Sequence, residues 1–418
     1  MQRSECQALD AKDLLAFLRQ QFYLPEGIIY LDGNSLGPLP VTTAIRLAAV
    51  LEQEWGKGLI RSWNTAGWIT LAQRVGEKIA KLIGAGSDEV IATDSTSVNL
   101  FKVLAVALRI AQQESKRRTE IISEAGNFPT DLYIAQGLTD LLGGSVTLRM
   151  VEREQILSAL NERTAVVMLT HVNYKTGQLW DMGQVTQAAH EAGALMVWDL
   201  AHSAGALPVE LKAVNADFAV GCGYKYLNGG PGAPAFVWVH PRHMHQGGQP
   251  LSGWLGHATP FAFTAEYRPA PGIHRYLCGT PPILSLTALD CGVDSVLAAQ
   301  IVGGMKALRN KSEQLTQLFI ELVEQHCGKY GLKLVSPRQL AQRGSQVSFS
   351  HEHAYPIMQA LIERGVIGDF RAPDILRFGF APLYTRFVDV WDAVQHLIQV
   401  LQLEEWQQSR FAQRNAVT

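Results

Sequence analysis

The stretch from about residue 88 to residue 240 alternates short apolar segments with helical patterns, and this alternation restricts the possible folds most strongly. Several of these segments are continuously apolar, which indicates strands that are covered on both faces of a sheet. Strands separated by helices are typical of parallel βαβ units. We therefore predict an α/β fold with a mostly parallel, seven-stranded sheet flanked by helices. The predicted strands are 90–93, 120–123, 146–151, 165–170, 195–199, 218–221 and 236–239, with helices near 97–113, 130–141, 153–161 and 183–192.

The last third of the chain has a pattern typical of a smaller α+β domain. Apolar residues from Leu308 to Leu322 mark one face of a long helix. Short strands at 333–335, 346–349 and 375–378 alternate with helices at 354–364 and 386–402.

The N-terminal part precedes the alternating region. Leucines at positions 9, 14, 15 and 18 predict a helix within 8–22, followed by a strand at 28–32, a loop at 33–38 and helices at 41–56 and 70–83. We predict three parts: an N-terminal segment, 1–55, that packs with the small domain, a large domain, 56–290, and a small C-terminal domain, 291–418.

Charge and composition argue against several classes of function. The net charge of −2, with no long charge run, gives no support for a nucleic-acid or membrane partner. The five cysteines are odd in number and scattered, which favours a reducing cytosol over disulfides or a metal site. The N-terminus lacks an apolar signal region, and the apolar runs are too short to span a bilayer. We expect a cytoplasmic protein without a metal.

Five polar groups follow predicted strands, where open α/β sheets bind their ligands. Thr96 and Ser97 open a helix, and their hydroxyls and free backbone N–H groups would bind an anion or form a plain helix cap. Phe128 and Asp131 would face a flat ring, or mark a helix start led by Pro129. Thr170 ends another strand; its alternative role is to satisfy polar groups at the end of that strand. No GxGxxG or GxxxxGK[ST] motif supports nucleotide binding.

Asp199 and Lys225 are the two most informative of these residues. A carboxylate at the end of a buried strand needs a partner, and the N–H of a pyridinium ring is one such partner. A helix cap or an ion pair would be the structural alternative. Lys225, with Tyr224 beside it, stands between a strand and a glycine-rich loop, where a lysine would either reach solvent or act as an amine nucleophile. The set as a whole predicts a site for pyridoxal phosphate (PLP) held as a Schiff base.

Several longer motifs resemble the fold-type I PLP enzymes of the aspartate aminotransferase superfamily and, more closely, the kynureninase family, in its bacterial form. The matching stretches are 30–37 (YLDGNSLG), 62–64 (SWN), 127–131 (NFPTD), 171–177 (HVNYKTG), 198–205 (WDLAHSAG), 223–232 (GYKYLNGGPG), 253–254 (GW) and 377–384 (RFGFAPLY). They cover almost the whole chain.

The resemblance implies PLP-dependent hydrolysis of L-kynurenine, and more weakly of 3-hydroxy-L-kynurenine, to anthranilate (or 3-hydroxyanthranilate) and L-alanine, an activity of tryptophan degradation in the kynurenine pathway. It assigns catalysis to Lys225, Tyr224 and Asp199. It assigns the cofactor to Thr96, Ser97, Phe128, Pro129, Thr130, Asp131, Thr170, Asp199, His202, Tyr224, Lys225, Trp254 and Thr280. It assigns the substrate to Arg377, Trp63, Gly279, Thr280 and Asn34, with Arg377 on the α-carboxylate. Trp254 and Thr280 would come from the other subunit of a homodimer.

Three other functions remain open on this scaffold. A cysteine desulfurase or selenocysteine lyase would need a reactive cysteine on a late, mobile loop, but the last cysteine, Cys327, falls at the end of a helical stripe. An aminotransferase would be distinguished by a second half-reaction with a keto acid. A catalytically idle PLP-binding regulator would usually carry an added basic domain, for which the first 27 residues are too few and too acidic.

Overall fold

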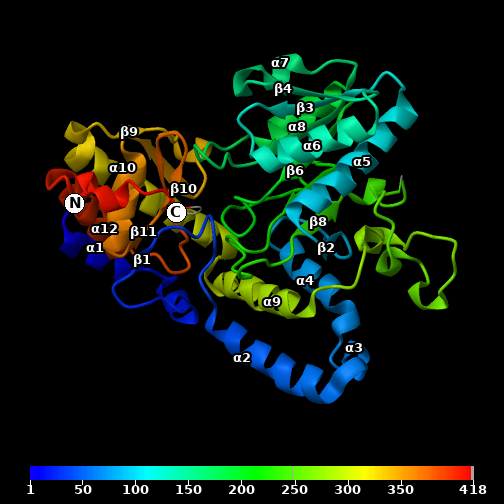
Figure 1. Ribbon diagram of the computed structural model, residues 1–418, viewed down its shortest axis with the longest axis horizontal. Helices are drawn as coiled ribbons and strands as arrows, with labels where there is room; N and C mark the ends of the chain where they lie inside the picture. The colour runs from blue at the N-terminus through cyan, green and yellow to red at the C-terminus, as the bar shows by residue number, and fades with distance from the viewer. Residues whose placement is uncertain (247, 416–418) are drawn as a thin grey trace.

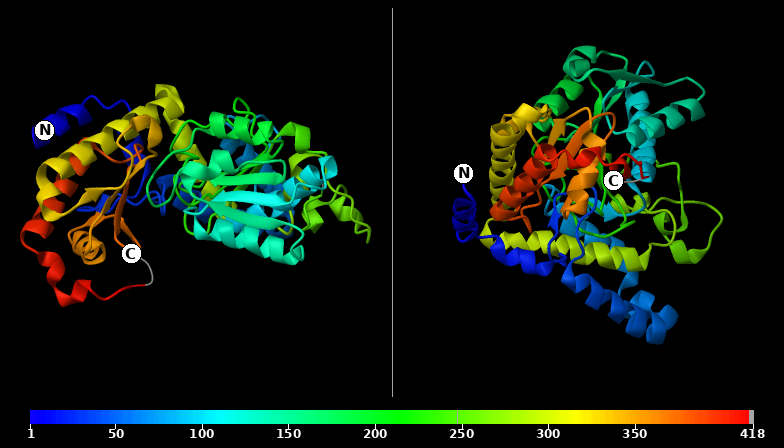
Figure 2. Two further views of the ribbon diagram at one scale, coloured as in Figure 1. Left: turned by 90° about the horizontal axis from the view of Figure 1, so that it is seen from above. Right: turned by 60° about the vertical axis from the view of Figure 1, so that its left-hand side comes forward.

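The computed structural model describes residues 1–246 and 248–415, which form two lobes joined along one side (Figure 1). The larger lobe contains the residues of the alternating region. The smaller lobe contains both Met1 and Asn415, the first and last described residues (Figure 2). The boundaries at residues 55 and 290 stay predictions.

The larger lobe is built on a seven-stranded sheet with the order β2-β8-β7-β6-β5-β3-β4. All neighbouring pairs are parallel except the two that involve β8, which runs against both β2 and β7. The predicted fold class and all seven predicted strands are therefore confirmed. The strands are β2 Val90–Ala92, β3 Glu120–Glu124, β4 Thr147–Val151, β5 Thr164–Thr170, β6 Leu195–Asp199, β7 Phe218–Gly221 and β8 Phe236–Val239.

Helices cover both faces of this sheet (Figure 2). They are α4 Leu71–Ala80, α5 Thr96–Glu114, α6 Pro129–Leu141, α7 Ile156–Ala159, α8 Met182–Glu191 and α9 Ile283–Leu297. Local chemistry sets where three of them begin. Ser95 Oγ accepts a hydrogen bond from Val98 N at the start of α5, Pro129 occupies the first turn of α6, and Asp181 Oδ1 accepts from Gln184 N at the start of α8.

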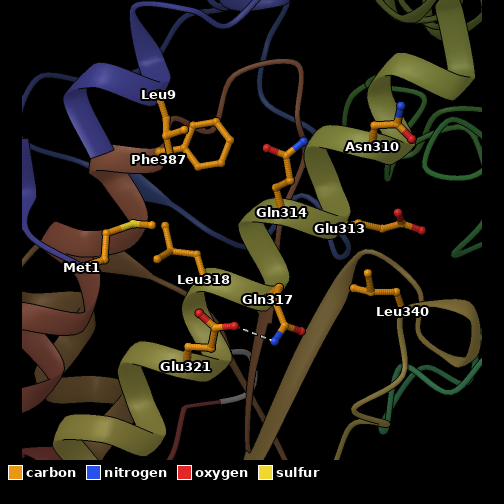
Figure 3. Close-up of a pocket in the computed structure, with 10 residues that line it drawn as sticks. All are labelled: Met1, Leu9, Asn310, Glu313, Gln314, Gln317, Leu318, Glu321, Leu340 and Phe387. Atoms are coloured by element: carbon orange, nitrogen blue, oxygen red, sulfur yellow. Dashed lines mark hydrogen bonds between the residues drawn. The ribbon is translucent and has the colours of Figure 1, made fainter. Parts of the chain in front are cut away.

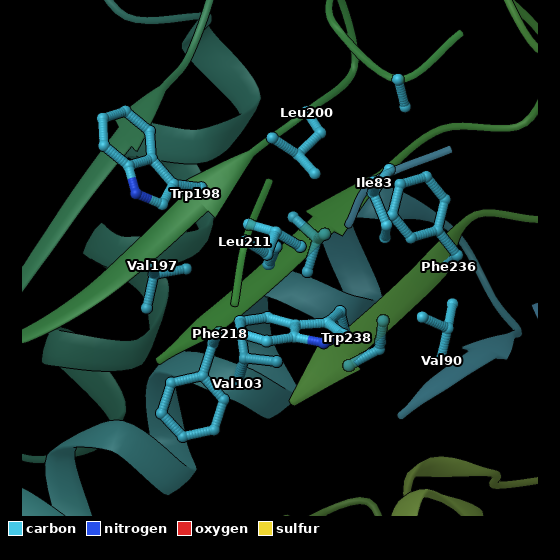
Figure 4. Packing of buried hydrophobic residues seen from close by; sticks show 14 of the residues in the cluster. Ile83, Val90, Val103, Val197, Trp198, Leu200, Leu211, Phe218, Phe236 and Trp238 are labelled. Atoms are coloured by element: carbon cyan, nitrogen blue, oxygen red, sulfur yellow. The ribbon is translucent and has the colours of Figure 1, made fainter. Parts of the chain in front are cut away.

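Large apolar side chains fill the space between the sheet and the helices (Figure 4). Trp198, Phe218 and Trp238 are fully buried in three neighbouring strands. Val103 from α5 packs against the same cluster. Burying one such side chain stabilises the fold by about 1.5–3 kcal/mol, so the sheet is a rigid support for the loops at its edge.

The smaller lobe is an antiparallel, four-stranded sheet with the order β12-β13-β10-β9, packed against helices. Its strands are β9 Lys333–Leu334, β10 Gln346–Ser350, β12 Asp369–Arg371 and β13 Ile375–Gly379, and its helices are α10 Gly304–Cys327, α11 Ala354–Glu363 and α12 Phe387–Gln402. Strand β12 was not predicted, because three residues are too few to show a pattern.

The N-terminal segment contacts the smaller lobe. Helix α1, Arg3–Asp10, lies against α12, and β1, Ile29–Tyr30, pairs in parallel with β11, Val366–Ile367. The predicted helix within 8–22 is wrong, since α1 ends at Asp10 and only a 3₁₀ turn, Ala16–Gln21, follows. The physical reason is that Asp10 accepts hydrogen bonds from the backbone N–H groups of Phe387 and Val388 at the start of α12.

A helical arm leaves the body of the protein after this segment (Figure 1). It consists of α2, Val41–Ala49, a π-helical stretch, Val50–Gly58, and α3, Ser62–Thr65. Its large apolar side chains Ile45, Leu51, Trp55 and Ile60 are exposed. This amount of exposed apolar surface on one arm is typical of a surface that another chain covers.

One stretch, Ile283–Val302, is long and apolar enough by length and composition to cross a membrane. Half of it is buried inside the protein, and α9, which forms most of it, packs against α4 and α2. A helix in the core of a globular protein passes the same test, so this stretch is weak evidence for a membrane span.

Candidate active site

A cavity of about 200 Å³ lies beyond the carboxyl ends of the parallel strands. The loops after β2, β3, β5, β6 and β7 all contribute to it. Its lining residues are Ser95, Thr96, Ser97, Phe128, Thr130, Asp131, Thr170, Tyr174, Asp199, Ala201, His202, Cys222, Tyr224 and Lys225. The structure thus brings together most of the residues that the sequence predicts at the strand ends.

Lys225 is buried, with 9% of its surface exposed. The alternative in which this lysine reaches solvent is therefore wrong. It follows β7 in a tight turn in which Asn228 N donates to the Lys225 carbonyl at 2.9 Å. Its Nζ is 3.0 Å from Nε2 of His202 and 5.7 Å from the ring centres of Phe128 and Tyr224. The amine therefore points into the cavity.

A glutamine of the smaller lobe orients His202. Gln346 donates from Nε2 to the carbonyls of Asn173 and Tyr174, at 3.2 and 2.8 Å, so its Oε1 faces Nδ1 of His202 at 2.9 Å as an acceptor. Nδ1 then carries the proton, and Nε2 accepts from Lys225. Burial and the charge of Lys225 hold the pKa of His202 well below its usual range, so the ring is neutral. Sequence reasoning missed Gln346, because it lies within an ordinary strand pattern.

Two carboxyl groups face each other at the base of the cavity. Thr170 Oγ1 lies 3.1 Å from Asp131 Oδ2 and 3.5 Å from Asp199 Oδ2. Asp199 Oδ1 accepts from Ala201 N, while Asp131 Oδ1 has no hydrogen-bond partner among the described residues. Burial raises the pKa of both carboxyls, and the nearby Asp199 charge adds to the rise at Asp131. A bound N–H donor with positive charge would relieve both effects.

The opposite end of the cavity suits an anion. Thr96 and Ser97 form the first turn of α5, a helix of 19 residues with free backbone N–H groups at this end. Ser97 Oγ lies 3.2 Å from Thr130 Oγ1 in the first turn of α6. Phe128 stands between the two ends, with its ring held edge-on by Tyr174 at 5.1 Å. The arrangement fits a flat ring that carries a basic nitrogen at one end and a phosphate at the other.

Seven predicted site residues do not line this cavity within one chain: Asn34, Trp63, Pro129, Trp254, Gly279, Thr280 and Arg377. Trp63 and Trp254 line a separate apolar hollow of about 250 Å³, and 44% of the Trp254 surface is exposed. Gly279 and Thr280 are exposed on the loop that precedes α9.

Arg377 lies beside the cavity and is fully buried. Its Nη1 donates to the carbonyl of Tyr174, a lining residue, and its Nε and Nη2 pair with Asp369. Asn34 is also buried, and its side-chain nitrogen and oxygen have no partner among the described residues. Sequence reasoning missed Tyr174, Asp369, Ser35 and Arg371 as individual site residues, although Tyr174 and Ser35 stand inside motifs that it used.

A second cavity, of about 480 Å³, opens between α1 and α10 (Figure 3). Its ten lining residues include Glu313, Glu321 and three side-chain amides, but no lysine, cysteine or histidine. None of these side chains could form a Schiff base, so we place the chemistry at Lys225.

Two family models match the chain. The kynureninase C-terminal domain matches residues 308–397, and the DegT/DnrJ/EryC1/StrS aminotransferase family matches residues 59–213. Among curated proteins, kynureninases of Pseudomonas fluorescens and of Burkholderia mallei (strain SAVP1) are each 57% identical over 417 residues, which is 100% of this chain and 99% of the relative.

Solved structures with a similar fold have low sequence identity. A cysteine desulfurase from Thermococcus onnurineus NA1 has a TM-score of 0.77 at 19% identity, covering 92% of this chain and 98% of its own. A C-DES mutant with glycine covalently linked to its PLP cofactor has a TM-score of 0.76 at 18% identity, with the same coverage. These structures support the fold alone.

Proposed function

The chain belongs to the kynureninase family, and we propose that it uses the cavity around Lys225 to hydrolyse L-kynurenine to anthranilate and L-alanine with pyridoxal phosphate. The observation that carries this proposal is the convergence of an amine, two buried carboxyls, a neutral histidine and a helix N-terminus in one cavity. No single motif would specify that set.

The cavity fits the cofactor at both ends. Asp199 would bind the ring nitrogen, beside Asp131, whose Oδ1 lacks a partner among the described residues. Thr96 and Ser97, with the N–H groups of α5, would bind the phosphate together with the Tyr224 hydroxyl. Phe128 would stack on the ring. When bound, pyridoxal phosphate supplies a protonated ring that takes up the electron pair left on the substrate carbon.

The residues around the ring would accept protons from the substrate and donate protons to it. Lys225 Nζ would hold the cofactor and, once released from it, would take the α-proton of the bound amino acid. Water would add to the γ-carbonyl of the substrate, and breakage of the Cβ–Cγ bond would release anthranilate. Burial raises the pKa of Tyr224, so its hydroxyl keeps a proton that it can give to the β-carbon to form L-alanine.

The cysteine desulfurase alternative finds no support in Cys327. This thiol is buried, and burial raises its pKa to about 12. Because the thiolate is the reactive form, Cys327 is a poor nucleophile. All five cysteines are free thiols, which supports a cytoplasmic location.

We also propose a homodimer in which Trp254 and Thr280 of each subunit complete the phosphate site of the other. Both residues lie outside the cavity of their own chain, and the arm and the 254–263 loop expose large apolar side chains, including Trp55, Ile60 and Phe263. Trp63, Gly279 and Thr280 would line the aryl pocket and favour L-kynurenine over its 3-hydroxy form.

The test of the activity is anthranilate release from L-kynurenine, with 3-hydroxy-L-kynurenine measured alongside. Lys225→Ala should abolish both the release and the visible absorbance of the bound cofactor, while Lys333→Ala, at an exposed lysine of the small domain, should change neither. A protein that binds the cofactor but releases no anthranilate would contradict the proposal.

The shared site has its own test. Lys225→Ala and Trp254→Ala are each expected to be inactive or weak, but their mixture should regain activity, since a hybrid dimer contains one site with both residues intact. Random pairing predicts roughly a quarter of the original sites. Failure of the mixture to recover, with subunit exchange demonstrated, would contradict the shared site.

A further inference from the structure

A buried carboxylate joins two arginines, one of which contacts Tyr174 in the lining of the cavity. Asp369 accepts from Arg377 Nε at 2.8 Å and from Arg371 Nη2 at 2.6 Å, and Ser35 Oγ donates to it at 2.7 Å. Arg371 lies on β12 and Arg377 on the neighbouring strand β13. The two guanidinium groups therefore lie close together, on either side of the Asp369 carboxylate.

Arg377 has little hydrogen-bonding capacity left for a ligand. A guanidinium carries five N–H donors. Among the described residues, one donor on Nε and one on Nη2 go to Asp369, one on Nη1 goes to the Tyr174 carbonyl, and the second on Nη2 goes to Ser35 at 2.9 Å. A carboxylate bound by two parallel hydrogen bonds needs two donors, and Arg377 has one to offer.

Arg371 has the missing donors. Its Nη2 is shared between Asp369 and Ser35, and its buried Nε has no hydrogen-bond partner among the described residues. Its side chain is 35% exposed, whereas that of Arg377 is 1% exposed. Its charge acts on cavity residues, since it lowers the pKa of Tyr224 and of His202, although burial dominates at both.

The charges around the pair leave an excess of positive charge. Asp369 is ionised, because the two arginines outweigh burial and lower its pKa. Burial and the Asp369 charge raise the pKa of Asp32, the other nearby carboxyl, well above its usual range, which disfavours its charged form. Two guanidinium charges thus face one carboxylate. A ligand with a single negative charge would balance the group.

We propose that Arg371 is a second substrate-binding residue, which donates together with Arg377 to the α-carboxylate of the amino acid, and that Asp369 positions both arginines. The inference rests on the proposed function in that the ligand is an α-amino acid. It differs in its test, because binding can be measured without turnover of kynurenine.

The experiment compares two ligands of the PLP-loaded protein, L-alanine and ethylamine, which is L-alanine without its carboxylate. Both are titrated while the change in cofactor absorbance is recorded, for the unsubstituted protein, Arg371→Gln and Arg371→Lys. Arg364→Gln is the matched control, since Arg364 is also paired with a carboxylate, Glu405, on the small domain. kcat and KM for L-kynurenine are measured in parallel.

Arg371→Gln should weaken L-alanine about 10- to 100-fold, as expected for loss of charged hydrogen bonds, and should raise KM more than it lowers kcat. It should leave ethylamine unchanged. Arg371→Lys, which keeps the charge, should have an L-alanine affinity between those of Arg371→Gln and the unsubstituted protein. Arg364→Gln should change the affinity for neither ligand. Equal weakening of both ligands, or unchanged L-alanine affinity, overturns the inference. A protein that binds L-alanine in this way without cleaving kynurenine would overturn the proposed function alone.

Discussion

Replacing Asp369 by asparagine should destabilise the small domain strongly, although the two side chains have nearly the same size. The carboxylate is almost completely buried and accepts from Arg371, Arg377 and Ser35. The amide keeps one acceptor oxygen and turns an N–H group toward a guanidinium donor. Two like charges, of which only that of Arg377 is fully buried, then remain without their counter-ion.

Loss of one partner from a buried ion pair costs about 3–5 kcal/mol. At about 2–4 °C per kcal/mol, the melting temperature of the transition that includes the small domain should fall by roughly 6–20 °C. The size of this stabilisation depends on pH. Asp369 has a lowered pKa, so its stabilisation is present above the unfolded value, about 3.9, and is lost as pH falls through the folded value. The difference between the two proteins should therefore persist at pH 7 and shrink in acid.

Calorimetry of the cofactor-loaded protein measures this effect, with Asp392→Asn as the control. Asp392 pairs with Arg3 at the surface, where solvent screens the interaction, so its loss should change the melting temperature little. In Asp369→Asn, the further change Arg371→Gln should restore part of the stability by removing one unpaired charge. A fall in melting temperature no larger than that of the control, or no recovery in the double variant, would refute this electrostatic account.

Three more substitutions test other contacts. Gly37→Ala would place a Cβ 2.5 Å from the Lys225 carbonyl, a backbone atom, so we expect about 1–3 kcal/mol of destabilisation and faster cofactor loss on dialysis. His171 has its pKa lowered by burial to about 3, so the unfolded chain binds more protons from about pH 6.5 down to about 3 and stability falls with pH in that window. His171→Gln should remove about 1.6 kcal/mol of the loss between pH 6.5 and 5, measured by denaturant unfolding at both pH values. Gln346→Leu should free the His202 ring, and we expect weaker cofactor binding in an absorbance titration; an unchanged affinity would contradict the tautomer assignment.

The part of the site that lies in the larger lobe was predictable because its geometry follows from topology. Parallel strands place their carboxyl ends at one edge of the sheet, so residues that follow different strands meet there. Thr96, Phe128 and Lys225 each follow a strand, Asp199 ends one, and all four line one cavity. For these residues, recognising the strands was enough to place the side chains.

The part supplied by the smaller lobe was less predictable, since it depends on how two domains pack. Gln346 lies on β10, within an ordinary strand pattern, yet its side chain reaches His202 of the large domain. Arg371 lies on a three-residue strand, and only its pairing with β13 brings it beside Arg377. The helix predicted within 8–22 was wrong for a related reason, because Asp10 binds the start of α12 instead of continuing its own helix. Such contacts between distant segments leave no periodic pattern in the sequence.

The loop of residues 33–38 connects the carboxylate site to the lysine. At one end, Ser35 Oγ contacts Asp369 and Arg377 of the small domain. At the other end, Gly37 N donates to the Tyr224 carbonyl at 2.8 Å, directly before Lys225. A shift of the arginines on binding a carboxylate would therefore be transmitted through the hydrogen bonds of Ser35 and Gly37 to the backbone directly before Lys225. It follows that substitutions at the carboxylate site should affect kcat as well as KM when they move Ser35, and KM alone when they remove a donor that contacts only the substrate.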